Sequence, residues 1–96
     1  MERGHFRAIL STAGATQADE GWWQLPEGKF LTLHMAHNGV GLSVARVTGV
    51  REEGSMVFAR TVKGEIFVLD QSDLFAGAVE GGTASSSART AGFSPR

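Results

Sequence analysis

The residues whose side chains are best suited to metal binding or catalysis are two histidines, His34 and His37, in the segment HMAH. Together with His5 they could supply imidazole nitrogens to a metal ion such as zinc. Residues three apart on a β-strand point to opposite faces, so His34 and His37 cannot readily hold one ion within a single chain. We therefore interpret them as surface and turn histidines and predict no metal ion and no cofactor. A metal ion shared across a subunit contact stays open.

Acid–base catalysis needs convergent carboxylates, or a histidine–carboxylate pair in a pocket. Asp70 and Asp73 are close in the sequence, but capping of a turn explains them more simply. The sequence contains no cysteine, no G-x-S-x-G elbow, no phosphate loop and no dinucleotide-binding motif. We therefore predict that the protein is not an enzyme, and a histidine-based metal enzyme is the weakest of the alternatives.

Two adjacent tryptophans, Trp22 and Trp23, offer aromatic surface for a peptide, a proline-rich segment or a stacked base. In an extended backbone their side chains point to opposite sides, so one can enter a core while the other stays near solvent. Pro26 follows closely and cannot donate a hydrogen bond to a neighbouring strand. This segment is therefore not expected to be a central strand.

Four basic residues on neighbouring segments support an alternative function, that of a small nucleic-acid-binding β-barrel. Arginine and lysine would contact phosphates while a tryptophan stacks on a base. The formal net charge of the chain is -1, so it has no basic surplus of the kind that drives generic phosphate binding. The charge disfavours this alternative, whose residues are Arg46, Arg51, Arg60 and Lys63.

The elements that would position these residues centre on a β-hairpin at Asn38-Gly39. Asn-Gly between two segments of alternating apolar residues indicates a two-residue type I′ turn. Such a turn sets the register, with these pairs opposite one another: His37 and Val40, Met35 and Leu42, Leu33 and Val44. One face of the hairpin is then apolar and is expected to be core: Leu31, Leu33, Met35, Val40, Leu42 and Val44.

The other face of this hairpin carries small or mildly polar side chains: Thr32, His34, Ala36, Ser43 and Ala45. A solvated sheet face usually displays charged residues, so a face like this one is easily desolvated and suits docking. We therefore predict a non-catalytic interaction module, or adaptor, that binds a protein partner or forms homo-oligomers through this face or a sheet edge. The expected contact residues are Trp22, Trp23, Phe30, Thr32 and His34. Coverage of the face by the chain's own N-terminal segment would weaken this prediction.

The remaining segments predict further strands. Apolar and polar side chains alternate weakly along residues 5–11, which indicates a short N-terminal strand. Between Arg46 and Gly49 the apolar residues move from even to odd positions, which indicates a β-bulge or bend. Residues 55–62 and 65–69 predict a second hairpin. Its expected shared face carries Phe58, Arg60, Phe67 and Leu69. Because both sides of 65–69 are apolar, that strand is expected to be buried on both faces.

The segment 70–80 predicts a short helical turn followed by a closing strand. Asp70 and Ser72 are good capping residues for a turn carrying Leu74 and Phe75, which Gly77 would end. Four strands in a meander, one helical turn and a last strand have the layout of a small SH3-like barrel. A bent β-meander sandwich is the alternative prediction within the same all-β class.

Length and composition indicate one small domain. The chain has 96 residues, of which 42% are hydrophobic and 20% charged, as in ordinary globular domains. We assign 1–80 to this domain, with an N-terminal edge strand and loop at 1–24 and the β-meander core at 25–80. The Gly/Ser-rich residues 81–96 predict a disordered tail. The lack of cysteine fits the cytoplasm, and no segment is apolar over the roughly 18 residues that a membrane span needs.

Overall fold

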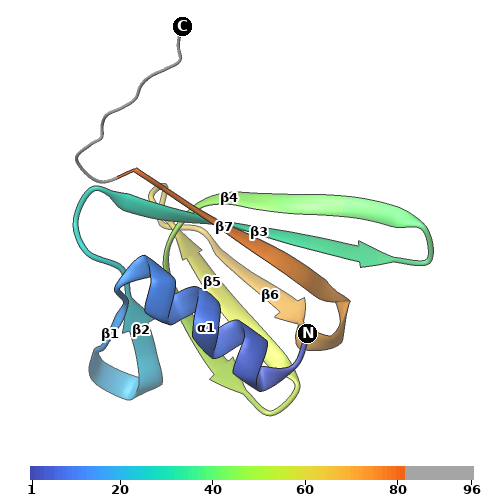
Figure 1. Ribbon diagram of the computed structural model, residues 1–96, viewed down its shortest axis with the longest axis horizontal. Coiled ribbons are helices and arrows are strands. Elements are labelled where there is room, and N and C mark those ends of the chain that lie inside the picture. Colours follow the sequence, from blue (N-terminus) through green and yellow to red (C-terminus); the bar gives the residue numbers. More distant parts are fainter. Residues whose placement is uncertain (82–96) are drawn as a thin grey trace, which may run out of the picture.

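The computed structural model describes residues 1–81, which form a strongly curled, seven-stranded antiparallel sheet and one α-helix (Figure 1). This confirms the predicted small all-β class, in the form of a half-barrel. The predicted tail, apart from Gly81, lies outside the described residues. The elements are α1 Arg3–Ala13, β1 Thr16–Gln17, η1 Asp19–Gly21, β2 Trp22–Gln24, β3 Lys29–His37, β4 Val40–Glu53, β5 Met56–Thr61, β6 Ile66–Asp70, η2 Gln71–Asp73 and β7 Leu74–Gly81, where η1 and η2 are 3₁₀ turns.

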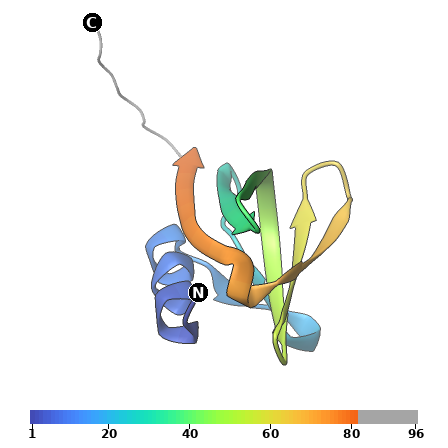
Figure 2. The same cartoon turned by 90° about the vertical axis from the view of Figure 1, so that its right-hand side faces the viewer.

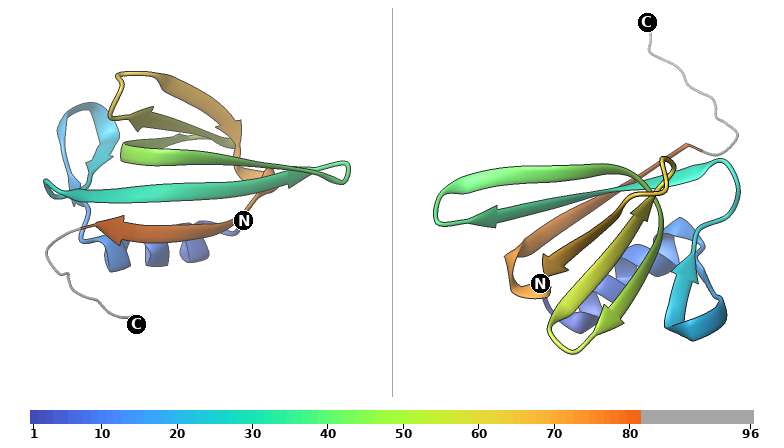
Figure 3. Two further views of the ribbon diagram at one scale, coloured as in Figure 1. Left: turned by 90° about the horizontal axis from the view of Figure 1, so that it is seen from above. Right: turned by 180° about the vertical axis from the view of Figure 1, so that it is seen from behind.

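The hairpin of β3 and β4 has the predicted turn and register. Asn38 and Gly39 both have positive φ, 51° and 81°, as a type I′ turn requires. The predicted cross-strand pairs are all present, from His37–Val40 to Leu33–Val44. The hairpin projects beyond the rest of the molecule (Figures 1 and 3). Its tip residues Val40 and Leu42 are therefore exposed, and their expected place in the core is wrong.

The predicted bend lies at the middle of the 14-residue strand β4. Arg46 has a φ of 58°, and the pairing shifts register between Leu31 and Leu33 on one side and between Val47 and Gly49 on the other. A β-bulge of this kind increases local twist and bends a strand. The first half of β4 consequently pairs with β3 alone, while its second half pairs with β2 and β5.

The N-terminal segment is a helix, so the expected strand at 5–11 and the N-terminal edge strand of 1–24 are wrong. The buried residues Phe6, Ile9, Leu10 and Ala13 recur at helical spacing and form one apolar stripe. Gly14, with a φ of 75°, ends the helix by donating its amide to the carbonyls of the last turn. The helix packs on the concave side of the sheet beside β7 and β3 (Figure 2).

The hairpin of β5 and β6 differs from its predicted form. Phe58 is paired with Val68 and Ala59 with Phe67, so the expected shared face of Phe58 and Phe67 is wrong. The reason is a longer turn, which is closed by a hydrogen bond from the Thr61 amide to the Glu65 carbonyl. β6 is an edge strand, and its three apolar residues 66–68 are exposed rather than buried on both faces.

After β6 the chain makes the predicted short turn and returns along β3. Asp70 accepts hydrogen bonds from the amide and hydroxyl of Ser72 and caps η2. Leu74 and Gly77 lie within β7, which begins earlier than predicted, so Gly77 does not end the turn. The main strand order is therefore β7-β3-β4-β5-β6. No helix within residues 1–81 is long and apolar enough to cross a membrane.

Candidate interaction surfaces

The uncharged face of the β3–β4 hairpin is not covered by the N-terminal segment. α1 packs on the opposite side of the sheet, where Ile9 lies against Gly77 and joins the core around Leu31 and Leu33 (Figure 2). On the open side, β7 extends the face, because the Phe75 ring lies 6.3 Å from the His34 ring, centroid to centroid. Two charged side chains border the uncharged face at its Phe30 end: Glu80, which is paired with Phe30, and Arg46, whose guanidinium lies over the Phe30 ring. The uncharged face itself is made by Phe30, Thr32, His34, Ala36, Ser43, Ala45, Phe75, Ala76 and Ala78.

Two hydrogen bonds tie the polar side chains of this face across neighbouring strands. The Thr32 hydroxyl donates to Glu80 Oε2 on β7 at 3.3 Å, and His34 Nδ1 shares a hydrogen bond with Ser43 Oγ on β4 at 2.8 Å. Polar side chains that already have partners cost less to remove from water. The face is therefore suited to contact with another apolar or weakly polar surface.

Three outer strands of the sheet, the two-residue β1 and the longer β6 and β7, each leave one edge unpaired. Ile66 and Val68 on β6 are 52% and 54% exposed, and Phe75 on β7 is 57% exposed. Because the Thr61 amide bonds to the Glu65 carbonyl, antiparallel alternation turns the backbone groups of Ile66 and Val68 outward. Residues 66–69 and 74–79 contain no charged side chain. This is unusual, because charged side chains commonly protect an edge strand from pairing with another chain.

The two tryptophans lie away from the uncharged face. Trp22 and Trp23 point to opposite sides of β2, as expected for neighbours on a strand. Trp22 is buried, with the Arg60 guanidinium 4.1 Å from its ring centroid. Trp23 is half-buried against the core, with Arg7 of α1 at 5.8 Å. The structure thus brings together Phe30, Thr32 and His34, but not the tryptophans.

The four basic residues of the nucleic-acid alternative fall into two groups. Arg51 and Arg60 lie on the convex face formed by β4 and β5, where Arg51 is 5.0 Å from the Phe58 ring and is paired with Glu53. Arg46 lies at the bend, 4.5 Å from the Phe30 ring, and Lys63 lies in the turn between β5 and β6. Arg46 and Lys63 both line a pocket.

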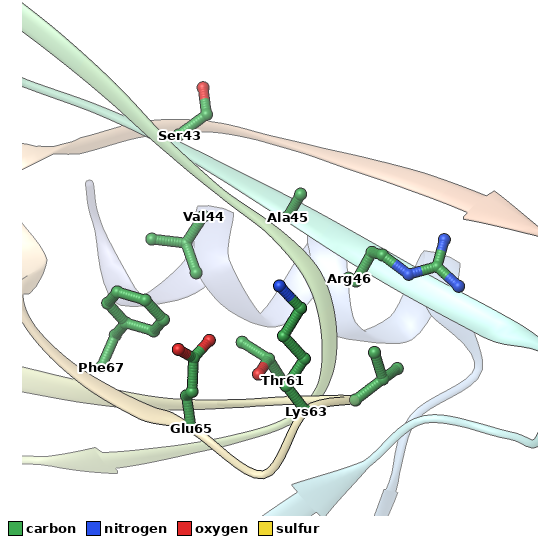
Figure 4. Close-up of a pocket in the computed structure, with 9 residues that line it drawn as sticks. Ser43, Val44, Ala45, Arg46, Thr61, Lys63, Glu65 and Phe67 are labelled. Carbon is green, nitrogen blue, oxygen red and sulfur yellow. The ribbon is translucent and has the colours of Figure 1, made fainter.

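This pocket, which the sequence did not indicate, lies between the first half of β4 and the β5–β6 hairpin (Figure 4). Its volume is about 240 Å³, and its inner wall includes Val44, Thr61 and the Phe67 ring. The Thr61 hydroxyl is buried and has no hydrogen-bond partner within the described part of the chain. The only sequence signal was the change of phase in the apolar alternation at Arg46, where the bend separates the first half of β4 from the β5–β6 hairpin.

The histidines have separate partners. His34 is bonded to Ser43, whereas His37 Nδ1 lies 2.9 Å from Asp73 Oδ1 of η2. That hydrogen bond, with the charge of the carboxylate, raises the pKa of His37. The two bonds from Ser72 hold the pKa of Asp70 below its usual value. Among residues 1–81, no group of three histidine or carboxylate side chains is arranged to hold a metal ion.

The geometry defines a small half-barrel with an uncharged face and open sheet edges. Comparison of the chain with protein-family models, with curated proteins and with solved structures found no significant match.

Proposed function

We propose that the protein is a non-catalytic interaction module that associates with further copies of itself through the free edges of its sheet. One observation carries this proposal: two of the outer strands, β6 and β7, present apolar, uncharged residues beside unpaired backbone groups. Sheet proteins that stay monomeric usually protect such edges with charge, proline or a covering element. Neither edge carries a charge or a proline along residues 66–69 or 74–79, although α1 adjoins β7 at Gly77.

The positions of the two edges determine the form of the assembly. β6 and β7 lie at opposite ends of one curled sheet, so pairing β6 of one copy with β7 of the next uses two different surfaces. Head-to-tail contacts of this kind build rings when the rotation closes and filaments when it does not. The uncharged face adjoins the β7 edge through Phe75 and His34, and it supplies a second surface for a neighbouring copy or a protein partner.

Light scattering coupled to size-exclusion chromatography tests the proposal, with a mass above that of one chain as the expected result. Val68→Pro removes an outward-pointing amide of β6 without breaking its bonds to β5, and it should reduce the mass to that of a monomer. Val68→Thr keeps the amide and should leave the assembly intact. A wild-type chain that is monomeric at high concentration would contradict the proposal.

Nucleic-acid binding is the second candidate function. It is supported by Arg51 and Arg60, which lie on the same convex face with their guanidinium groups over the rings of Phe58 and Trp22. Such contacts should be strongest at low salt, because phosphate binding releases counterions. Lack of binding to single-stranded oligonucleotides at low salt would remove this candidate. A cytoplasmic location stays a prediction from the cysteine-free composition.

A further inference from the structure

A further unpaired edge runs along the first half of β4. Residues 40–45 pair with β3 on one side only, because pairing with β5 begins at Val47. In a two-residue hairpin the closing pair, His37–Val40, is hydrogen-bonded. Alternation along β4 then directs the backbone groups of Gly41, Ser43 and Ala45 away from β3. This edge therefore offers a row of donors and acceptors to an added strand.

The same stretch of β4 borders two hollows on the concave side of the sheet. At one end is the pocket of about 240 Å³ between Val44 and Phe67 (Figure 4). At the other end is a hollow of about 390 Å³ lined by Met35, Val40 and Leu42. Val40 and Leu42 are 68% and 59% exposed, which is unusual for apolar residues on the core side of a hairpin.

The size of the pocket beside Phe67 indicates a side chain rather than a small-molecule ligand as its occupant. Ligand pockets are usually about 300–1,000 Å³, so the pocket beside Phe67 is better matched to one side chain. Residues 40–45 carry no charge. Lys63 and Glu65 at the pocket rim have opposite charges but form no ion pair within residues 1–81 (Figure 4). Arg46 also lines the pocket, but its guanidinium lies over the Phe30 ring, which leaves Lys63 and Glu65 to balance each other at the rim.

We propose that the free edge of β4 binds an extended, uncharged peptide segment of a partner protein as an added strand. Its backbone pairs with Gly41, Ser43 and Ala45, and its alternate apolar side chains enter the two hollows, as in other cases of strand addition. The pocket is bounded on both sides by the same molecule, so a free segment fits it better than the edge of a folded second copy. This site is separate from the edges of β6 and β7.

Selection of a phage-displayed library of random linear peptides on the full chain tests the proposal. Peptides with alternating apolar residues should be enriched. Ser43→Pro, which removes an outward amide, should weaken their binding about tenfold, because a peptide carbonyl loses its donor. Ser43→Ala is the matched control, since it removes only the hydroxyl bonded to His34 and should leave the affinity unchanged.

A second measurement applies even where Ser43→Pro fails to fold. Only one edge of the bound peptide pairs with β4, so only every second peptide amide points toward β4. N-methylation of those amides should abolish binding, whereas N-methylation of the amides between them should be tolerated. Amide chemical shifts should change at Gly41, Ser43 and Ala45, with no change in assembly mass by light scattering. Failure to enrich any peptide, equal binding to Ser43→Pro, tolerance of both N-methylation patterns, or dissociation of the assembly would each overturn the proposal.

Discussion

Thr61 is the residue whose hydrogen bonding is least complete. It is only 6% exposed, and its hydroxyl has no partner within residues 1–81. A buried polar group without a partner costs about 1–3 kcal/mol. Thr61→Val replaces the hydroxyl with a methyl group of similar size, so it should raise the free energy of unfolding by about 1 kcal/mol. Urea denaturation measures this change, and a less stable variant would contradict the assignment.

His37 is the residue with a predictable pH response. Its hydrogen bond to Asp73 raises its pKa above the ordinary value of 6.5, so the fold favours the protonated imidazole. The resulting stability is fully present below pH 6.5 and is lost as the pH rises through the raised pKa. NMR titration should show a raised pKa for His37 that returns towards its ordinary value in Asp73→Asn. Titration of wild-type His37 at its ordinary value would exclude this contact in solution.

At the scale of elements, the packing of α1 on β7 depends on the lack of a side chain at Gly77. A Cβ there would lie 2.9 Å from Ile9 Cγ2. Gly77→Ala should therefore cost roughly 1–3 kcal/mol in unfolding free energy, as overpacking does. The cost should shrink in an Ile9→Ala background, because the atoms that clash are gone. Gly41→Ala is the control: its Cβ meets only an ordinary contact at 3.9 Å, so its effect should be small.

The elements that the sequence predicted well are those fixed by local interactions. Asn38 and Gly39 determine turn type and register by their backbone preferences, and the change of phase near Arg46 locates the bend. α1 was missed because residues 6, 8 and 10 alternate over a short window, although Phe6, Ile9, Leu10 and Ala13 carry the helical spacing. The faces of β5 and β6 were exchanged because a longer turn shifts the register by one residue.

The candidate surfaces likewise include features that the local sequence determines and features that depend on distant parts of the chain. The uncharged face was predicted because alternation assigns side chains to faces once the register is known. Its extension by Phe75 required the pairing of β7 with β3, which joins residues far apart in the chain. The pocket and the free edge of β4 depend on how far the bend separates β4 from the β5–β6 hairpin, and no local sequence pattern specifies that separation.

At the scale of the whole molecule, the open strand order accounts for the proposed assembly. The turn η2 directs the chain from β6 away to the opposite end of the sheet, where β7 pairs with β3 instead of closing the barrel onto β6. The half-barrel thus retains two different apolar edges. Association between copies would pair these edges and remove Ile66, Val68 and Phe75 from water.

A mixing experiment tests this central claim most directly. Val68→Pro blocks the β6 edge, and Phe75→Lys places a charge beside the β7 edge, so each variant alone should be a monomer. Met56→Lys, which adds the same charge on β5 opposite Asp70 and beyond the apolar edge residues 66–68, should still assemble as the wild type does. An equal mixture of the two edge variants should give a one-to-one dimer by light scattering, because each retains the edge that the other lacks. A mixture that stays monomeric, or a variant that still assembles alone, would contradict head-to-tail pairing of β6 with β7.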